Sequence, residues 1–226
     1  VNAYVAPRVT SYLERLAARL ADGGYKGQLM VMQASGGVMT RDYIEGSPIR
    51  VLASGPAGGV VGSAHAGKAK GCANLLCVDM GGTSYDMALV VNGEAPAEAG
   101  WNMHHRNLIG VPMVKVETLG AGGGSICHVS GGALQVGPRS AGSVPGPIAY
   151  GRGGSEPTVT DALVMLGILS TDEGFAGGSF RLSKQGVEEA FAALGAQLGT
   201  SAEQAAFDCW RVVNANMSQG VRRTTA

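Results

Sequence analysis

Residues 75–91 read LLCVDMGGTSYDMALVV, and the fold prediction starts from this stretch. An apolar run of strand length ends at Asp79, a glycine pair interrupts it, and a second apolar run begins at Met87. Asn92-Gly93 follows, and Asn-Gly between two strand-like runs predicts a hairpin because both central residues of a type I′ turn need positive φ. We therefore expect a strand, a tight glycine loop, a strand, a turn and a third strand at about 94–99, which together form an antiparallel meander.

The glycine loop at 81–82 differs from the common phosphate-binding loops. A P-loop ends in Lys-Ser/Thr and leads into a helix, as does a dinucleotide fingerprint, whereas a strand follows here. Two glycines let backbone N–H groups approach an anion closely, and Thr83 and Ser84 add hydroxyl donors. Asp79 and Asp86 place carboxylates beside the loop, which suits a Mg²⁺ ion that keeps most of its water. An ordinary tight hairpin with Asp at its corners explains the same residues, since these are common turn residues.

The segment 79–86, DMGGTSYD, resembles the second phosphate motif of the actin, Hsp70 and sugar-kinase ATPase superfamily, and more narrowly the hydantoinase A/5-oxoprolinase family. Tyr85 departs from the small residue of the family motif. The resemblance covers nearly the whole chain, because further matching stretches occur in the family's order. These are NAY at 2–4, QASGGV at 33–38, SGPAGGVVG at 54–62, GAGGGSI at 120–126, VGPRSAG at 136–142, PGP at 145–147 and PTVTDA at 157–162.

The resemblance implies an α/β fold: an actin-like, ribonuclease-H-like mixed sheet with the antiparallel hairpin meander and flanking helices. It also implies two phosphate loops and an adenosine segment, of which residues 1–226 contain only the second phosphate loop, at about 72–100. We therefore expect an incomplete, internal fragment of a hydantoinase A/oxoprolinase-type domain. Because a triphosphate held from one side is poorly neutralised, we expect the isolated fragment to bind nucleotide weakly or not at all.

The activity implied by the resemblance is ATP-dependent opening of a cyclic amide of the hydantoin or 5-oxoproline type, through phosphorylation of the amide oxygen. The implied cofactors are ATP and Mg²⁺ or another divalent cation, and the implied partners are a small cyclic amide and a hydantoinase B-type subunit. Asp79 and Asp86 are then catalytic, with Asp79 on the metal. The residues expected to bind the nucleotide phosphates or line the cleft are Gly81, Gly82, Thr83, Ser84, Gly122, Gly123, Gly124 and Ser125.

Two other functions stay open from the sequence. The first is the ATP-using subunit of an acetone- or acetophenone-type carboxylase, which shares the ATP module. The second is a non-catalytic structural domain that serves subunit assembly. The retained Asp79, Gly81, Gly82 and Thr83 argue against the second function.

Composition sets the broad class. Of 226 residues, 45% are hydrophobic and 15% are charged, which predicts a packed core. The 17 basic and 17 acidic residues cancel, so nothing indicates a nucleic-acid or membrane-surface partner. No apolar run approaches the roughly 20 residues of a membrane span, and no signal peptide is recognisable, so we expect a cytoplasmic protein. The four cysteines lack CxxC spacing, which favours reduced, mostly buried thiols over a zinc site.

The remaining pattern predicts helices at 1–21, 60–70, 160–169 and on either side of 200, a strand at 28–33 with a tight loop at 34–37, and a strand at 113–118. A hairpin around Gly131-Gly132 and an ordered loop over a cleft at 137–154 are also expected. Residues 101–111 give no regular pattern, and His104-His105-Arg106 favours a solvated loop over a metal site. The helix caps expected are Ser54, Thr160, Ser183 and Thr200, and Asp161 has either a capping or a catalytic role.

Overall fold

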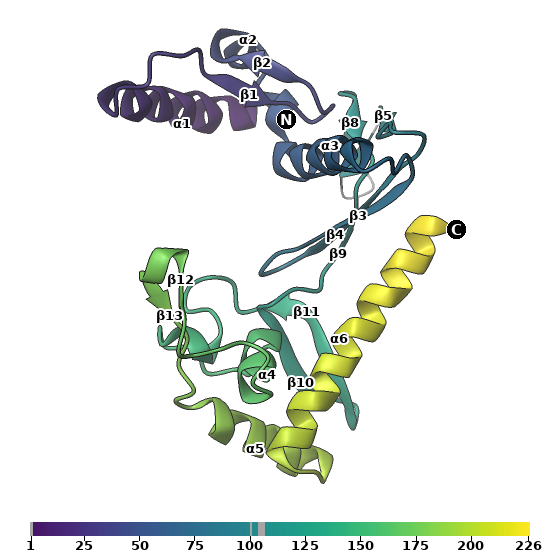
Figure 1. Ribbon diagram of the computed structural model, residues 1–226. Coiled ribbons are helices and arrows are strands. Elements are labelled where there is room, and N and C mark those ends of the chain that lie inside the picture. Colours follow the sequence, from purple (N-terminus) through teal and green to yellow (C-terminus); the bar gives the residue numbers. More distant parts are fainter. Residues whose placement is uncertain (1, 100, 104–106) are drawn as a thin grey trace. The chain divides into compact units, whose positions relative to one another are not determined.

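The computed structural model describes residues 2–99, 101–103 and 107–226 (Figure 1). The chain divides into two compact units, residues 1–77 with 88–117, and residues 78–87 with 118–226. Helices and short antiparallel strand pairs occur in both units, so the α/β class is confirmed. Among the described residues, no helix has the length and apolarity needed to cross a membrane.

The central hairpin forms where the sequence predicts it. Strand β3 (Leu75–Met80) and strand β4 (Tyr85–Val90) belong to a three-stranded sheet of order β3-β4-β9, with β9 at Glu117–Leu119. The Asn-Gly turn also forms, with φ of 55° at Asn92 and 82° at Gly93.

The predicted third strand of the meander does not lie beside β4. Strand β5 (Ala97–Glu98) pairs instead with β8 (Met113–Val114), and a bridge between Val91 and Glu94 follows β4 at the turn. Pro96 gives the physical reason, because proline has no N–H to extend a ladder. Its carbonyl accepts a hydrogen bond from Lys115 N at 2.9 Å, which ties this segment to the β8 side.

The first unit is built from short elements around two small cores. Helix α1 confirms the predicted N-terminal helix, and the expected strand at 28–33 shortens to β1, which pairs with β2 across the loop at 34–37. One core gathers residues of α3, β3, β4 and β8, and the other includes Ala34 and Ile49. The elements are α1 (Asn2–Asp22), β1 (Met30–Met32), β2 (Val38–Thr40), α2 (Arg41–Gly46), η1 (Pro48–Val51) and α3 (Ser54–Ala69).

Two predictions for this unit need correction. Helix α3 begins at Ser54, earlier than expected, and its N-cap is Ala53 with φ of 54°, so Ser54 is not the cap. Its glycines are tolerated within the helix because packing, and not intrinsic propensity, supplies most helix stability. The segment expected to be irregular contains an antiparallel pair, β6 (Trp101–Met103) with β7 (Asn107–Ile109). His104, His105 and Arg106 lie outside the described residues.

The second unit packs three helices against a hairpin. Gly131 and Gly132 have φ of 59° and 78° and join β10 to β11 as predicted, but β11 continues to Ser140, into the segment expected to be a loop. The elements are β10 (Ser125–Ser130), β11 (Ala133–Ser140), η2 (Ile148–Tyr150), α4 (Val159–Met165), β12 (Gly174–Phe175), η3 (Ala176–Gly178), β13 (Phe180–Arg181), α5 (Val187–Leu198) and α6 (Ala202–Thr225).

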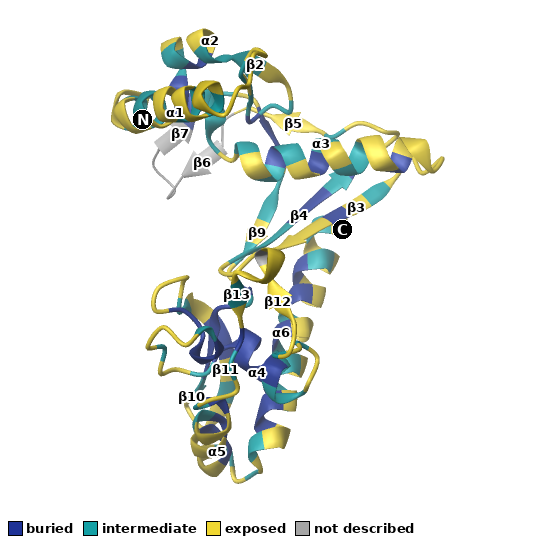
Figure 2. Ribbon diagram, turned by 60° about the vertical axis from the view of Figure 1, so that its left-hand side comes forward, coloured by how far each residue is buried: buried dark blue, intermediate teal, exposed yellow. Residues whose placement is uncertain are grey.

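The core of this unit is continuous (Figure 2). Phe191 of α5 is fully buried and α6 contributes a stripe at helical spacing, of which Cys209 and Val213 are members. Cys127, Cys209 and, in the first unit, Cys77 are buried free thiols, as predicted, whereas Cys72 is exposed.

The helix caps lie close to the predicted positions but on other residues. Thr158, and not Thr160, caps α4. Gly186 caps α5 in place of Ser183, whose hydroxyl accepts from Gln185 N at 3.1 Å. Ser201, and not Thr200, caps α6. For α4 and α6, neighbouring hydroxyl residues are chemically equivalent as caps, so sequence alone does not choose among them. The cap of α5 is a glycine with φ of 79° and no side-chain hydrogen bond.

Candidate functional site

The bend between β3 and β4 is exposed and is closed by a backbone hydrogen bond. Gly81 N donates to Ser84 O at 2.9 Å, which leaves Gly82 and Thr83 at the tip. Strand β3 ends at Met80 and β4 begins at Tyr85, directly on either side of the bond between Gly81 and Ser84. This implies a register in which Asp79 lies opposite Asp86 on one face of the hairpin. Like charges directly opposite in a ladder are unfavourable, so this arrangement favours a cation beside them.

Three consecutive N–H groups of the bend have no hydrogen-bond acceptor among the described residues. Within the described part of the chain, no hydrogen bond is donated by the amides of Gly82, Thr83 or Ser84. Gly82 and Thr83 are exposed, and Ser84 is partly exposed. Successive free amides with adjacent hydroxyl groups form the kind of concavity that holds phosphate oxygens.

The glycine run at 122–124 supports the bend from behind. Gly123 N and Gly124 N donate to the carbonyls of Gly81 and Gly82 at 3.1 and 2.6 Å. A Cβ on Gly122 would lie 2.7 Å from the Gly81 oxygen, a distance that real Cβ atoms do not reach. The run therefore consists of glycines because two backbones touch there.

This contact changes what the glycine run can offer a nucleotide. The Gly123 and Gly124 amides are used by the bend, and Gly122 N donates to Ser125 Oγ at 2.9 Å. Ser125 itself is fully buried. Direct phosphate contact by these four residues stays a prediction, and the role that the geometry favours for them is to hold the bend in shape.

Helix α4 anchors the glycine run in turn. Gly123 O accepts hydrogen bonds from Thr160 N at 2.7 Å and from Thr160 Oγ1 at 2.9 Å. Asp161 is fully buried and accepts from Thr158 N, Ile148 N and Ala149 N at 2.9, 3.2 and 2.7 Å. With no exposed surface and all these donors, Asp161 has the capping role and not the catalytic one.

Two hydroxyl groups beside the bend were not among the predicted site residues. Thr118 Oγ1 donates to Asp86 Oδ1 at 2.6 Å, which fixes that carboxylate. Ser140 Oγ lies 3.4 Å from Thr83 Oγ1 and accepts from Gly142 N at 3.1 Å. Ser140 belongs to the VGPRSAG stretch of the family resemblance, and this membership is the feature of the sequence that could have indicated Ser140 as a site residue. Tyr85 packs against the core of the second unit.

Asp79 and Asp86 fit a weakly chelated divalent cation better than a closed metal site. No group of three or more His, Cys, Asp or Glu side chains that could hold a metal is found among the described residues. Mg²⁺ usually binds through one or two carboxylates together with substrate phosphates and water. Asp79 is exposed and Asp86 partly exposed, so phosphate and water can reach both.

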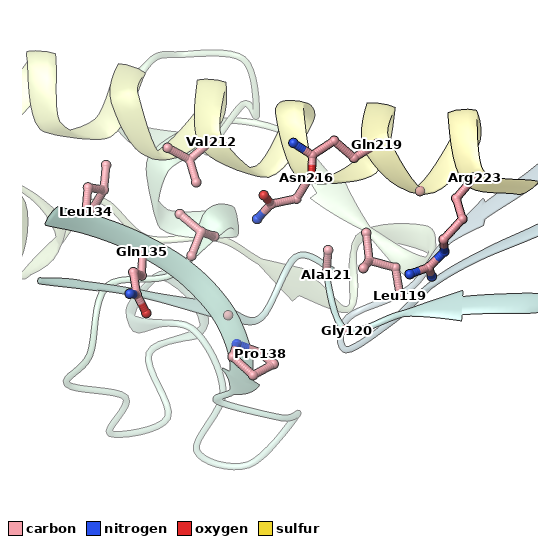
Figure 3. Close-up of a pocket in the computed structure, with 13 residues that line it drawn as sticks. Leu119, Gly120, Ala121, Leu134, Gln135, Pro138, Val212, Asn216, Gln219 and Arg223 are labelled. Atoms are coloured by element: carbon pink, nitrogen blue, oxygen red, sulfur yellow. The ribbon is translucent and has the colours of Figure 1, made fainter. Parts of the chain in front are cut away.

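Two pockets of the second unit lie near this region. One of about 650 Å³ opens between α6 and β11, where Asn216, Gln219 and Arg223 extend from the helix (Figure 3). The other, of about 370 Å³, is lined by Ile126 and by residues of the segments 139–146 and 154–156, including Ser140.

Comparison with known proteins places the chain in a family. The family model described as Hydantoinase/oxoprolinase matches residues 1–226. The alpha subunit of a caprolactamase from Pseudomonas jessenii is 42% identical over 227 residues, covering 100% of this chain and 32% of that protein. 5-Oxoprolinase 1 of Arabidopsis thaliana is 35% identical over 174 residues, covering 76% of this chain and 13% of that protein.

Solved structures agree with this assignment. A nucleotide-free acetone carboxylase, described as ATP-dependent, matches with a TM-score of 0.85 and 29% identity over 96% of this chain and 31% of that chain. The ATP-dependent caprolactamase from Pseudomonas jessenii matches with a TM-score of 0.75 and 40% identity over 99% of this chain and 32% of that chain. The chain thus belongs to the hydantoinase/oxoprolinase family and spans about a third of the length of these caprolactamase and carboxylase relatives.

Proposed function

We propose that this chain carries part of the ATP site of an enzyme that opens a cyclic amide, with the β3–β4 bend holding nucleotide phosphates. The observation that carries the proposal is the set of three amides, at Gly82, Thr83 and Ser84, that donate no hydrogen bond within the described residues, next to the solvent-accessible Asp79 and Asp86. Relatives described as ATP-dependent support the use of ATP.

The phosphoryl step depends on positioning and charge neutralisation. The bend amides and the Thr83 and Ser84 hydroxyls would bind phosphate oxygens, and Asp79 would hold Mg²⁺ or its water, with Asp86 fixed by Thr118. Mg²⁺ would neutralise charge on the phosphates. The glycine run behind the bend keeps the amides pointed in one direction without reorganisation when the nucleotide binds.

The chemistry of a cyclic amide explains the need for ATP. Resonance makes the amide carbonyl a poor electrophile. The amide oxygen attacks the terminal phosphorus of ATP, a new O–P bond forms, ADP leaves, and the ring nitrogen gives up its proton. Water then adds to the activated carbon and the C–N bond breaks, which frees the amine and leaves an acyl phosphate. A second water hydrolyses the acyl phosphate and releases inorganic phosphate and the amino acid. The cyclic-amide substrate is supported by the caprolactamase and 5-oxoprolinase relatives, and a partner subunit by the caprolactamase relative being an alpha subunit. That this partner is of the hydantoinase B type is part of the proposal.

The second candidate is an ATP-using carboxylase subunit, which the high structural similarity to acetone carboxylase favours. The two candidates differ in the substrates that ATP turnover requires. A carboxylase turns over ATP only with bicarbonate and a ketone, whereas an amide hydrolase needs a cyclic amide and water. Measuring ADP release by the full-length protein and its partner subunit under each condition separates them.

Substitution of Asp79 tests the shared ATP chemistry. We expect Asp79→Ala in the full-length protein to lower ATP turnover by about a hundredfold or more, since a divalent cation and its charge are lost from the transition state. Asp22→Ala, an exposed carboxylate at the end of α1, is the control and should leave turnover unchanged. Unchanged turnover in folded Asp79→Ala would favour the non-catalytic structural domain.

A further inference from the structure

The pocket beside Ser140 combines polar and apolar groups that the phosphate site does not use. It has a volume of about 370 Å³, which is at the small end of ligand pockets. Ile126 and Pro145 give it an apolar wall. Arg139 and Glu156 also line it, and Arg139 Nη2 forms an ion pair with Glu156 Oε1 at 2.6 Å. Ser155 adds a hydroxyl.

Ser140 joins this pocket to the proposed phosphate site. Its hydroxyl lies 3.4 Å from Thr83 Oγ1 at the tip of the bend, and Ser140 also lines the pocket. The junction is held by backbone, because Ala141 N donates to Gly124 O at 2.8 Å and Gly124 N donates to Gly82 O at 2.6 Å. A molecule in the pocket would therefore lie next to a phosphate bound at Thr83, with a hydroxyl between them.

We propose that this pocket binds the phosphoryl acceptor, a small cyclic amide. The inference rests on the proposed function and names the acceptor subsite of the same site. An amide ring needs a donor for its carbonyl oxygen, an acceptor for its N–H and apolar surface for its methylene groups. Ser140 or Arg139 supplies the donor, Glu156 the acceptor, and Ile126 with Pro145 the apolar surface.

The test measures amide binding separately from nucleotide binding. The full-length protein is loaded with a non-hydrolysable ATP analogue and Mg²⁺, and ε-caprolactam, 5-oxoproline and hydantoin are titrated as probes by ligand-observed NMR. Glu156→Gln keeps the shape of the side chain but removes its charge, and should weaken binding of the amide that binds wild type by about tenfold, the effect of one charge-assisted hydrogen bond. The affinity for the analogue should stay within about twofold.

The control is Glu189→Gln, an exposed carboxylate in the first turn of α5 that lies outside the pocket and should bind the probes as wild type does. Ser140→Ala should also weaken binding of the cyclic amide. The proposal is overturned if none of the three amides binds wild type, or if Glu156→Gln binds them unchanged. Failure of the ATP assignment itself would look different, because Asp79→Ala would then retain ATP turnover.

Discussion

At the scale of single residues, the glycines of this chain have separable roles. Gly122 touches the backbone of the bend, whereas a Cβ on Gly82 would meet no atom within 4 Å. Sequence shows both as members of similar glycine clusters. The structure separates a glycine that two backbones require from one whose open side faces solvent, where a phosphate oxygen would approach.

Alanine substitutions at these two glycines should affect different properties. Gly122→Ala forces a Cβ to within 2.7 to 2.8 Å of Gly81 and Thr83 backbone atoms, and should lower the free energy of unfolding by about 2–3 kcal/mol. Gly82→Ala should leave that free energy within about 0.5 kcal/mol but reduce nucleotide affinity, since the new methyl group occupies the approach to the free amides. Urea denaturation and titration with a fluorescent ATP analogue measure the two quantities.

A Gly122→Ala protein as stable as wild type would show that the bend and the glycine run can separate. Nucleotide affinity unchanged in Gly82→Ala would place the phosphates elsewhere. Each result thus bears on one of the two roles alone.

At the scale of elements, the strongest local signals predicted the structure best. The Gly-Gly and Asn-Gly turns, the N-terminal helix and α6 all form where periodicity and turn chemistry indicate. The prediction that a third strand lies beside β4 was wrong. Strand β5 pairs with β8, Lys115 N donates to the Pro96 carbonyl, and these contacts between distant residues are not contained in a local sequence pattern. For the same reason sequence could not pair Thr118 with Asp86 or Ser140 with Thr83, residues 32 and 57 positions apart.

Asp161 should matter more to stability than an ordinary helix cap. It accepts three backbone hydrogen bonds while fully buried, so Asp161→Ala leaves several donors without partners in the core. We expect the free energy of unfolding to fall by about 4 kcal/mol. Ser201→Ala, which removes the exposed cap of α6, is the comparison and should cost about 1 kcal/mol. Equal losses in the two variants, measured by urea denaturation, would contradict a special role for the Asp161 network.

At the scale of the whole molecule, the two units have separate hydrophobic cores, and buried cysteines lie in both units. Cys77 belongs to a core of the first unit, and Cys127 and Cys209 share the core of the second. A hydrogen bond with the Cys209 thiol, and to a smaller extent burial, raise the pKa of Cys127 well above its ordinary value of 9.0. The folded protein therefore keeps this proton, and the unfolded chain loses it first as pH rises.

Thiol labelling should follow this division. In native protein N-ethylmaleimide should modify Cys72 alone, and with increasing urea Cys127 and Cys209 should become reactive together, on a curve that need not coincide with that of Cys77.

Because the pKa of Cys127 is raised by folding, its contribution to stability is present below pH 9.0 and is lost as pH rises above it, so the urea midpoint for Cys127 and Cys209 should fall in that range. Cys127→Ala removes that pH dependence and serves as the control. Peptide mass spectrometry identifies the labelled thiols, and different urea midpoints for Cys127 and Cys209 would refute a shared core that opens as one body.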